Sequence, residues 1–403
     1  MKPLRRALDR VAPHFQKGGR LERLHPLYEA VDTILYTPGR VTRTASHVRD
    51  ALDLKRMMIT VVIAMLPCVV FAMYNTGYQA ALAVEAGAPM RETFREALFS
   101  AMGLTLASVD VFTCFVFGAL YFVPVLIVAF AAGGLVEVIF AIVRGREVAE
   151  GFLVTGFLIP LILPPTVPLW QVFVGTVFGV VFGKEVFGGV GMNFLNPALV
   201  VRAFLFFAYP SELSGDAVWI AAVTGPDGVS GATPLLLAQT EPERFQLDWM
   251  QAFFGFIPGS MGETSTLACL LGAALLVATG IGSYRTMLGV FLGTAALAWL
   301  FELVGSETNP LFSLGLEWHL VLGGWAFGTV FMATDPVSST FTDVGKWIYG
   351  FCIGALTVLI RVVNPAFPEG MMLAILFMNI FAPLIDHYVV KAHVRRRLAR
   401  HGL

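Results

Sequence analysis

The sequence contains little charge. Only 14% of its 403 residues are Asp, Glu, Lys or Arg, whereas 57% are hydrophobic and the mean hydropathy is +0.74. An ordinary soluble domain has about 25% charged residues, and so few charges cannot cover so large an apolar fraction. The same composition excludes an intrinsically disordered chain. What remains is a polytopic, all-α membrane protein.

Cysteine is also scarce. Four cysteines are too few for a disulfide scaffold, and Cys68, Cys114, Cys269 and Cys352 each lie alone in an apolar run, as small buried hydrophobes do. No pair has metal-ligand spacing, so we expect no zinc or iron–sulfur site built from this chain alone. The net charge of −1, with the basic residues gathered at the two ends, argues against nucleic acid as a partner. No cleavable signal peptide is expected, because the first apolar run begins near Met57.

Ten apolar runs divide the chain. The third and the eighth are shorter than the roughly 20 residues that a full crossing needs. Each ends at proline, in Leu163-Pro164-Pro165 and in Thr334-Asp335-Pro336, so we interpret both as broken helices that stop within the membrane. Such breaks persist only where protein or a cavity satisfies the freed backbone groups. The runs are 57–74, 111–143 (interrupted by Pro124 and Gly133-Gly134), 152–163, 169–183, 194–209, 264–281, 287–304, 319–332, 347–362 and 371–390.

The basic residues indicate which side each loop faces. With ten spans, 22 Lys and Arg residues fall on one side and four on the other. This asymmetry predicts that both termini are cytoplasmic and that the 75–110 and 210–263 loops face outward. The predicted divisions are a cytoplasmic N-terminal arm (1–56), membrane repeat one (57–209), a periplasmic loop (210–263), membrane repeat two (264–390) and a cytoplasmic basic tail (391–403).

The two halves share a pattern of proline and asparagine. Pro165 after the third run is followed 31 residues later by Asn196-Pro197, and Pro336 after the eighth run is followed 28 residues later by Asn364-Pro365. Five spans per half is an odd number, so a second copy would be inverted in the membrane. Inverted repeats with paired broken helices place a polar site near the midplane. A chance match of such short motifs remains the alternative.

The 210–263 loop carries a motif of small residues. Its residues Asp227, Ser230, Gly231, Ala232 and Thr233 fit Asp-x-x-Ser-Gly-Ala-Thr, the signature on which a periplasmic flavin transferase links FMN to the threonine hydroxyl. The acceptor must stand on a chain flexible enough to enter the transferase, on the side of the membrane where that enzyme works. The alternative is a plain turn. The residues that follow, Pro234-Leu235-Leu236, depart from the small or polar residues expected there.

Two glycine-rich clusters lie at predicted span ends. Residues 183–198 contain Asn193 and Asn196, whose amides suit the donors and acceptors of a flat ring such as isoalloxazine. The alternative is a turn with an Asn cap before Pro197. The pair Gly133-Gly134 could leave a slot for a planar head group, or could serve close helix packing.

Several charged residues fall inside predicted spans. An intramembrane carboxylate is a functional candidate by default, and carboxylate oxygens suit a hard cation. Glu137 and Asp335 are the leading candidates for an ion path, followed by Asp386, and Arg202 belongs to the same class. Pairing with a neighbouring span or subunit is an equally good account of each. The isolated His319 and His387 favour helix-end or capping roles over metal ligation.

Together these motifs resemble the family of B-type subunits of the bacterial sodium-translocating NADH:quinone oxidoreductase (Na+-NQR). The resemblance covers nearly the whole chain, and its motifs include Pro164–Trp170, Lys184–Gly189, Asn193–Ala198 and Arg202–Pro210. The D-type subunit of the related Rnf complex shares the flavinylation threonine but usually lacks the long N-terminal arm.

The resemblance implies a ten-helix, pseudo-symmetric fold similar to the urea-transporter class, in the bacterial inner membrane. It implies FMN linked to Thr233 through a phosphoester, riboflavin near Asn193 and Asn196, and ubiquinone reduced close to Gly133 and Gly134. The implied partners are five other subunits, Na+, membrane lipid and the flavin transferase. The competing functions are a D-type subunit of an Rnf complex, a channel or transporter for a small solute, and a structural membrane anchor.

Overall fold

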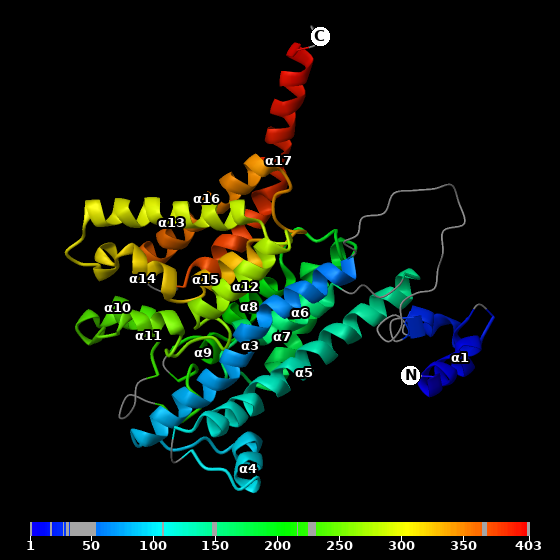
Figure 1. The fold of residues 1–403 in the computed structure, drawn as a ribbon, viewed down its shortest axis with the longest axis horizontal. Helices are drawn as coiled ribbons and strands as arrows, with labels where there is room; N and C mark the ends of the chain where they lie inside the picture. The colour runs from blue at the N-terminus through cyan, green and yellow to red at the C-terminus, as the bar shows by residue number, and fades with distance from the viewer. Residues whose placement is uncertain are drawn as a thin grey trace.

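The computed structural model describes residues 2–16, 18–26, 28–29, 32, 54–106, 109–146, 151–215, 217–224, 231–364 and 369–400. Throughout these residues the regular structure is helical, and no β-strand is present among them. Figure 1 shows long helices gathered in one bundle, with the N-terminal arm at its edge and the end of the last helix projecting from it. The predicted class, an all-α polytopic membrane protein, is confirmed.

Six helices in the described part of the chain are long and apolar enough to cross a membrane. The longest contain more than 30 residues, and a 32-residue helix extends about 48 Å, beyond the roughly 30 Å of a hydrocarbon core. Their ends therefore reach the headgroups or water. The six are α3 (Leu54–Glu85), α5 (Val111–Arg144), α7 (Leu169–Gly183) with the 3-10 turn Glu185–Phe187, α13 (Tyr284–Val304), α16 (Asp343–Val363) and α17 (Met371–Arg400).

The other four predicted runs fall on shorter segments. Three are the apolar helices α6 (Phe152–Ile162), α8 (Pro197–Ala208) and α12 (Thr266–Ala278). The eighth run consists of α14 (Leu316–Val321), α15 (Trp325–Phe327) and the π-helical turn η5 (Gly328–Met332). The two predicted breaks are confirmed as helix ends, because α6 ends before Leu163 and η5 ends before Ala333. That these four segments complete ten crossings stays a prediction.

Two helices run on where the sequence predicted a change. α5 is continuous through Pro124 and Gly133-Gly134, since a helix within apolar surroundings keeps every backbone hydrogen bond that it can. α17 continues to Arg400, because arginine, alanine and leucine in the basic tail are good helix formers. Shorter elements complete the described chain: α1 (Lys2–Phe15), α4 (Phe94–Ala101), α9 (Pro210–Leu213), α10 (Pro234–Thr240), α11 (Trp249–Phe254) and 3-10 turns at Glu22–Leu24, Pro242–Arg244 and Pro310–Ser313.

Helices pack in corresponding pairs in the two halves. α5 packs against α7 as α13 packs against α16, and α7 packs against α8 as α16 packs against α17. The short α6 contacts α3, α5 and α8, while the segment α14–η5 contacts α12, α13 and α17. The halves meet where α8 contacts α17 and where α3 packs on α12. At the second contact the sulfur atoms of Cys68 and Cys269 lie 3.8 Å apart, a proximity that their sequence spacing did not indicate.

Glycines allow a close helix contact between α13 and α16. A Cβ added at Gly289 would lie 3.0 Å from the carbonyl oxygen of Trp347, and one added at Gly354 would lie 2.7 Å from the amide nitrogen of Thr294. A Cβ at Gly293 would overlap the backbone of Phe351. Small residues that let helix backbones approach are a common basis of helix association in membranes. The pair α13–α16 is therefore a rigid unit of the second half.

We predict that Gly293→Val lowers the free energy of unfolding by about 1–3 kcal/mol, because the new side chain forces the backbones of α13 and α16 apart. Ala296→Val is the matched control, since Ala296 is exposed and Gly293 is buried. Denaturant titration of the purified protein in detergent measures both. Equal effects of the two variants would contradict the close-packing account.

Candidate functional site

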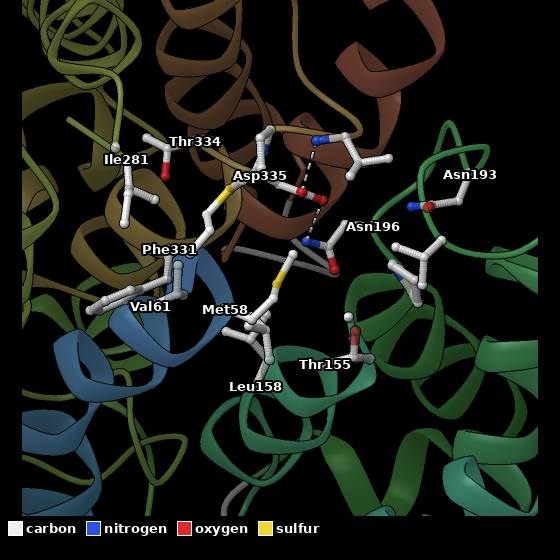
Figure 2. Close-up of a pocket in the computed structure, with 18 of the residues that line it drawn as sticks. Met58, Val61, Thr155, Leu158, Asn193, Asn196, Ile281, Phe331, Thr334 and Asp335 are labelled. Atoms are coloured by element: carbon white, nitrogen blue, oxygen red, sulfur yellow. Dashed lines mark hydrogen bonds between the residues drawn. The ribbon is translucent and has the colours of Figure 1, made fainter. Parts of the chain in front are cut away.

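A cavity of about 80 Å³ lies where the two broken segments come together. Its polar lining comes from both halves: Asn193 and Asn196 precede α8, while Thr334 and Asp335 follow η5. Apolar side chains such as Met58 of α3 complete the wall. Figure 2 shows Asn196 and Asp335 facing each other, with Asn193 farther to the right in the same view. The structure thus brings together residues that the sequence assigned separately to riboflavin and to an ion path.

Asn196 is held by its position at the start of α8. Its Oδ1 accepts hydrogen bonds from the amide nitrogens of Ala198 (3.0 Å) and Leu199 (3.4 Å), and Pro197 occupies the first helical position. The Asn cap considered from the sequence is therefore confirmed. Capping leaves Nδ2 directed toward the second half, where it donates to Oδ2 of Asp335 at 3.5 Å. One amide thus caps a helix and connects the two halves.

Asp335 begins the backbone turn that follows η5. Its Oδ1 accepts from the amide nitrogen of Val337 (3.1 Å), and its Oδ2 accepts from Oγ of Ser338 (2.8 Å). These donors, like the amide of Asn196, are neutral. A carboxylate held by neutral donors at a cavity keeps its capacity to attract a cation. Asn193 donates from Nδ2 to the carbonyl oxygen of Leu195 at 2.9 Å, which fixes its loop.

The size of the cavity limits what fits without movement. A dry cavity of about 150 Å³ accommodates benzene, so 80 Å³ is too small for a three-ring isoalloxazine as the side chains stand. The chemistry of the lining does fit such a ring, because the lining combines apolar carbon with amides, the hydroxyls of Thr155 and Thr334, and the charged side chains of Lys184 and Asp335. Met57 and Met58 form part of the wall, and methionine side chains are adaptable. A flavin at this place therefore requires these side chains to move apart.

Glu137 does not stand free in the membrane. Its carboxylate pairs with the ammonium group of Lys184, and both residues are at least 95% buried. Lys184 also lies 4.0 Å from Oε1 of Glu185, whose Oε2 accepts from Nη1 of Arg144 at 2.8 Å. The alternative of pairing with a neighbouring span is confirmed for Glu137. From the sequence, Lys184 was counted only as a basic residue in a loop. Glu137 and Lys184 both lie near the inner ends of predicted spans, and this shared position could have indicated that they form a pair.

The two candidate quinone glycines differ in their surroundings. A Cβ at Gly133 would overlap the ring of Phe152, so Gly133 serves close packing, whereas a Cβ at Gly134 would meet nothing within 4 Å. A larger cavity of about 1120 Å³ lies between the N-terminal arm and the end of α5 and includes Ile142 and Gly145. Along the helix, Gly134 lies about 16 Å from Gly145. The structure therefore does not place the glycine pair in that cavity.

Asp386 on α17 holds the start of α16. Its carboxylate accepts from the amide nitrogens of Phe341 (2.7 Å) and Thr342 (3.0 Å) and from Oγ1 of Thr342 (2.5 Å). Thr342 in turn caps α16. Both oxygens of Asp386 are thus engaged in fixing the connection between η5 and α16, which is a positioning role.

Thr233 lies at a different place, at the start of α10. Its hydroxyl oxygen accepts from the amide nitrogen of Leu236 at 3.3 Å, and only 9% of the residue is exposed. Asp227 and Ser230 lie outside the described residues, whereas Gly231 and Ala232 precede the cap. A small cavity of about 20 Å³ separates Thr233 from Ser260 and Glu263. Attachment of a large group to this hydroxyl therefore requires Thr233 to turn out of its cap.

Arg202 connects the small cavity beside Thr233 to α8. Its Nη1 donates to Oγ of Ser260 (2.9 Å) and lies 3.4 Å from Oε2 of Glu263. The intramembrane arginine predicted from the sequence is thus paired. Its partner Glu263 was not singled out, since it stands in a polar loop where a charge attracts no notice.

The sequence pattern of the NQR2, RnfD, RnfE family matches residues 41–395. The chain belongs to this family. All site residues described above fall within the matched range. As a member of this family, the chain has helix breaks after α6 and η5 and a helix cap at Asn196.

Relatives named as the B-type subunit of Na(+)-translocating NADH-quinone reductase are similar over nearly their whole length. The protein of Chromohalobacter salexigens is 56% identical over 400 residues, covering 98% of this chain and 96% of its own. That of Pseudomonas paraeruginosa is 57% identical over 410 residues, covering 99% and 100%. That of Azotobacter vinelandii is 55% identical over 404 residues, covering 98% and 99%. The similarity therefore includes the N-terminal arm.

We predict that Lys184→Met lowers the free energy of unfolding by about 3–5 kcal/mol, because it leaves the carboxylate of Glu137 buried without its partner. The double variant Glu137→Leu/Lys184→Met is expected to recover most of that loss, since no buried charge remains. Denaturant titration of all variants in detergent gives the coupling. The more exposed pair Arg285–Asp343 is the control, with an expected coupling of about 0–1 kcal/mol. A coupling as small for the buried pair would contradict this account.

Proposed function

We propose that the chain is the B-type subunit of a sodium-translocating NADH:quinone oxidoreductase, a translocase complex of the bacterial inner membrane. Identity above 55% to proteins of that name, over almost the whole of both chains, carries this proposal. The six apolar helices support the membrane assignment. Both termini are cytoplasmic in this proposal, as the distribution of basic residues predicts.

Three other functions were compatible with the sequence, and one of them, a structural membrane anchor, would need neither the glycine clusters nor the buried carboxylates. A D-type subunit of an Rnf complex belongs to the same family, but the relatives that match the whole chain, arm included, carry the quinone reductase name. A passive channel or solute transporter would use inverted repeats and broken helices equally well. Against it stands the motif that ends at Thr233, for which a pore has no use. The corresponding helix pairs of the two halves support ten spans in two inverted repeats, similar to the urea-transporter class.

Two flavin sites follow from this proposal. Thr233 would hold FMN through a phosphoester on the outer side, with Gly231 and Ala232 leaving room beside the hydroxyl. Asn193 and Asn196 would hold riboflavin at the cavity between the halves, their amides supplying donors and acceptors at its rim. Bound flavins supply the redox chemistry, and the protein supplies position and electrostatics. A periplasmic flavin transferase would attach FMN during maturation.

In this proposal the three intramembrane carboxylates have different roles in the passage of cations. Asp335, held by neutral donors at the cavity, would attract Na+ with the backbone carbonyls of the break beside it. Glu137 is neutralised by Lys184, so it would take part only when that pair separates. Asp386 would position the loop that carries Asp335. Moving one charge through 100 mV costs about 2.3 kcal/mol, which redox free energy must supply.

Quinone would bind on the inner side of α5. Gly134 offers open space at the helix surface, and the N-terminal arm borders the large cavity near Gly145. A ubiquinone head group in this region would lie beside membrane lipid, from which the quinone enters. Five other subunits would complete the complex, among them those that bring electrons from NADH.

We predict that Thr233→Ala abolishes the fluorescent flavin band of this subunit on a denaturing gel, because no acceptor hydroxyl remains. Thr240→Ala, an exposed threonine at the other end of α10, is expected to leave the band unchanged. A band that persists in Thr233→Ala would refute covalent attachment at this position.

We also predict that Gly134→Val changes the KM for quinone or the sensitivity to quinone-site inhibitors several-fold, since the new side chain enters open space without displacing the fold. NADH oxidation by the electron-input module with an artificial acceptor should stay normal. Gly133→Ala should instead reduce stability through its overlap with Phe152. Wild-type quinone kinetics in Gly134→Val would remove this site from the proposal.

A further inference from the structure

The small cavity beside Thr233 has both apolar and oxygen-bearing side chains in its lining. Its walls include the carboxylates of Glu263 and Glu369 and the hydroxyls of Thr233, Ser260 and Thr264. Glu263, Ser260 and Thr264 are each at least 95% buried. A volume of about 20 Å³ holds one particle the size of a water molecule. The place is therefore a small site for a single occupant, with several oxygen-bearing side chains in its wall.

One oxygen of Glu263 has no partner. Arg202 approaches Oε2 at 3.4 Å, while Oε1 is buried and accepts no hydrogen bond from any described residue. An unpaired, buried carboxylate oxygen carries a penalty of about 1–3 kcal/mol or more. Native structures rarely leave such a group unpaired without an ion, a water or a function. The unpaired oxygen thus indicates an occupant of the cavity.

Two glycines make room for the carboxylates. A Cβ at Gly324 would lie 3.1 Å from Cδ of Glu263, and a Cβ at Gly323 would lie 2.6 Å from Oε2 of Glu369. The amide nitrogen of Gly324 donates to the same Oε2 at 3.0 Å. Both carboxylates therefore lie against the Gly323-Gly324 pair, at the break between α14 and α15. A side chain at either glycine would displace them.

The arginines nearby do not close the site. Arg361 is completely buried, but its donors go to main-chain carbonyl oxygens: His319 at 2.7 Å, Leu322 at 2.8 Å and Glu369 at 3.2 Å. Arg202 divides its Nη1 between Ser260 and Glu263. The two guanidinium charges balance the two carboxylates overall. The cluster therefore carries no net charge, and a monovalent ion disturbs this balance less than a divalent ion does.

A polar connection leads from the cavity toward the far end of α3. Nδ2 of Asn75 donates to the carbonyl oxygen of Ile257 at 3.0 Å and lies 3.4 Å from Oγ1 of Thr264. Gln79, one turn further along α3, donates to Oδ1 of Asn75 at 3.3 Å. These side chains are buried, and they offer oxygen ligands between the cavity and the end of the helix.

We infer that Glu263, Glu369, Ser260 and Thr264 bind one hard monovalent cation beside Thr233. Carboxylate and hydroxyl oxygens are the ligands that such ions prefer, and Oε1 of Glu263, which has no hydrogen-bond partner, can act as one of them. The inference rests on the proposed function in one respect: the ion is Na+, the ion that the complex would transport. The site contacts α8 through Arg202 in the middle of that helix, and it includes Thr233, so it would serve the part of the path next to the attachment point of FMN.

Equilibrium dialysis of the purified complex against ²²Na+, with choline chloride holding the ionic strength constant, tests this inference. Glu263→Gln keeps the shape of the side chain and removes its charge, and it is expected to lower the number of bound ions by one per complex. Glu369→Gln retains an oxygen for the amide of Gly324 and is expected to weaken binding at that site about tenfold. Glu307→Gln, an exposed residue, is the control and should bind as the wild type does.

The outcomes separate this inference from the proposed function. If the wild type binds Na+ and both cavity variants bind the same number of ions with the same affinity, the inference fails and the function stands. If the wild type binds no Na+, the sodium part of the function fails as well. Retention of the covalent flavin band in Glu263→Gln and Glu369→Gln shows that both variants are folded. A cavity that holds only water would give equal counts in all variants.

Discussion

Helices that end within a membrane free backbone groups that lipid cannot satisfy, and the structure is organised around satisfying them. The carbonyl oxygens at the end of α6 accept from amides of the loop before α12: Gly262 donates to Leu161 at 2.7 Å and Met261 donates to Leu163 at 3.2 Å. The carbonyls at the end of α14 accept from Arg361. Polar groups from distant parts of the chain are thus drawn to each break.

The same requirement creates the two cavities. At one break, the capping amide of Asn196 and the turn carboxylate of Asp335 meet where the halves join. At the break between α14 and α15, Arg202, Glu263 and Arg361 gather around the Gly323-Gly324 pair. Polar side chains recruited to stabilise the backbone are then available to a ligand or an ion. Structural stability and the proposed transport therefore depend on the same residues.

The sequence predicts much of this, because its signals are local. The apolar runs predict the helices, and prolines after Leu163 and Asp335 predict the breaks. The cap at Asn196 follows from the proline after it. Pairing across the chain has no local signal: neither the partnership of Glu137 with Lys184 nor that of Arg202 with Glu263 can be predicted from spacing. The extension of α17 beyond its apolar run escapes a hydropathy pattern for a different reason, because the tail is charged although its residues are good helix formers.

The central proposal is that Asn193 and Asn196 hold a flavin distinct from the one attached at Thr233, in the cavity where Asn196 donates to Asp335 of the other half. Acid precipitation of the purified complex separates the two flavins, because a covalent flavin stays with the protein and riboflavin is released. The account predicts that Asp335→Leu lowers the riboflavin released per complex several-fold and leaves the protein-bound flavin of this subunit unchanged. Release of the wild-type amount of riboflavin from a folded Asp335→Leu complex would contradict it.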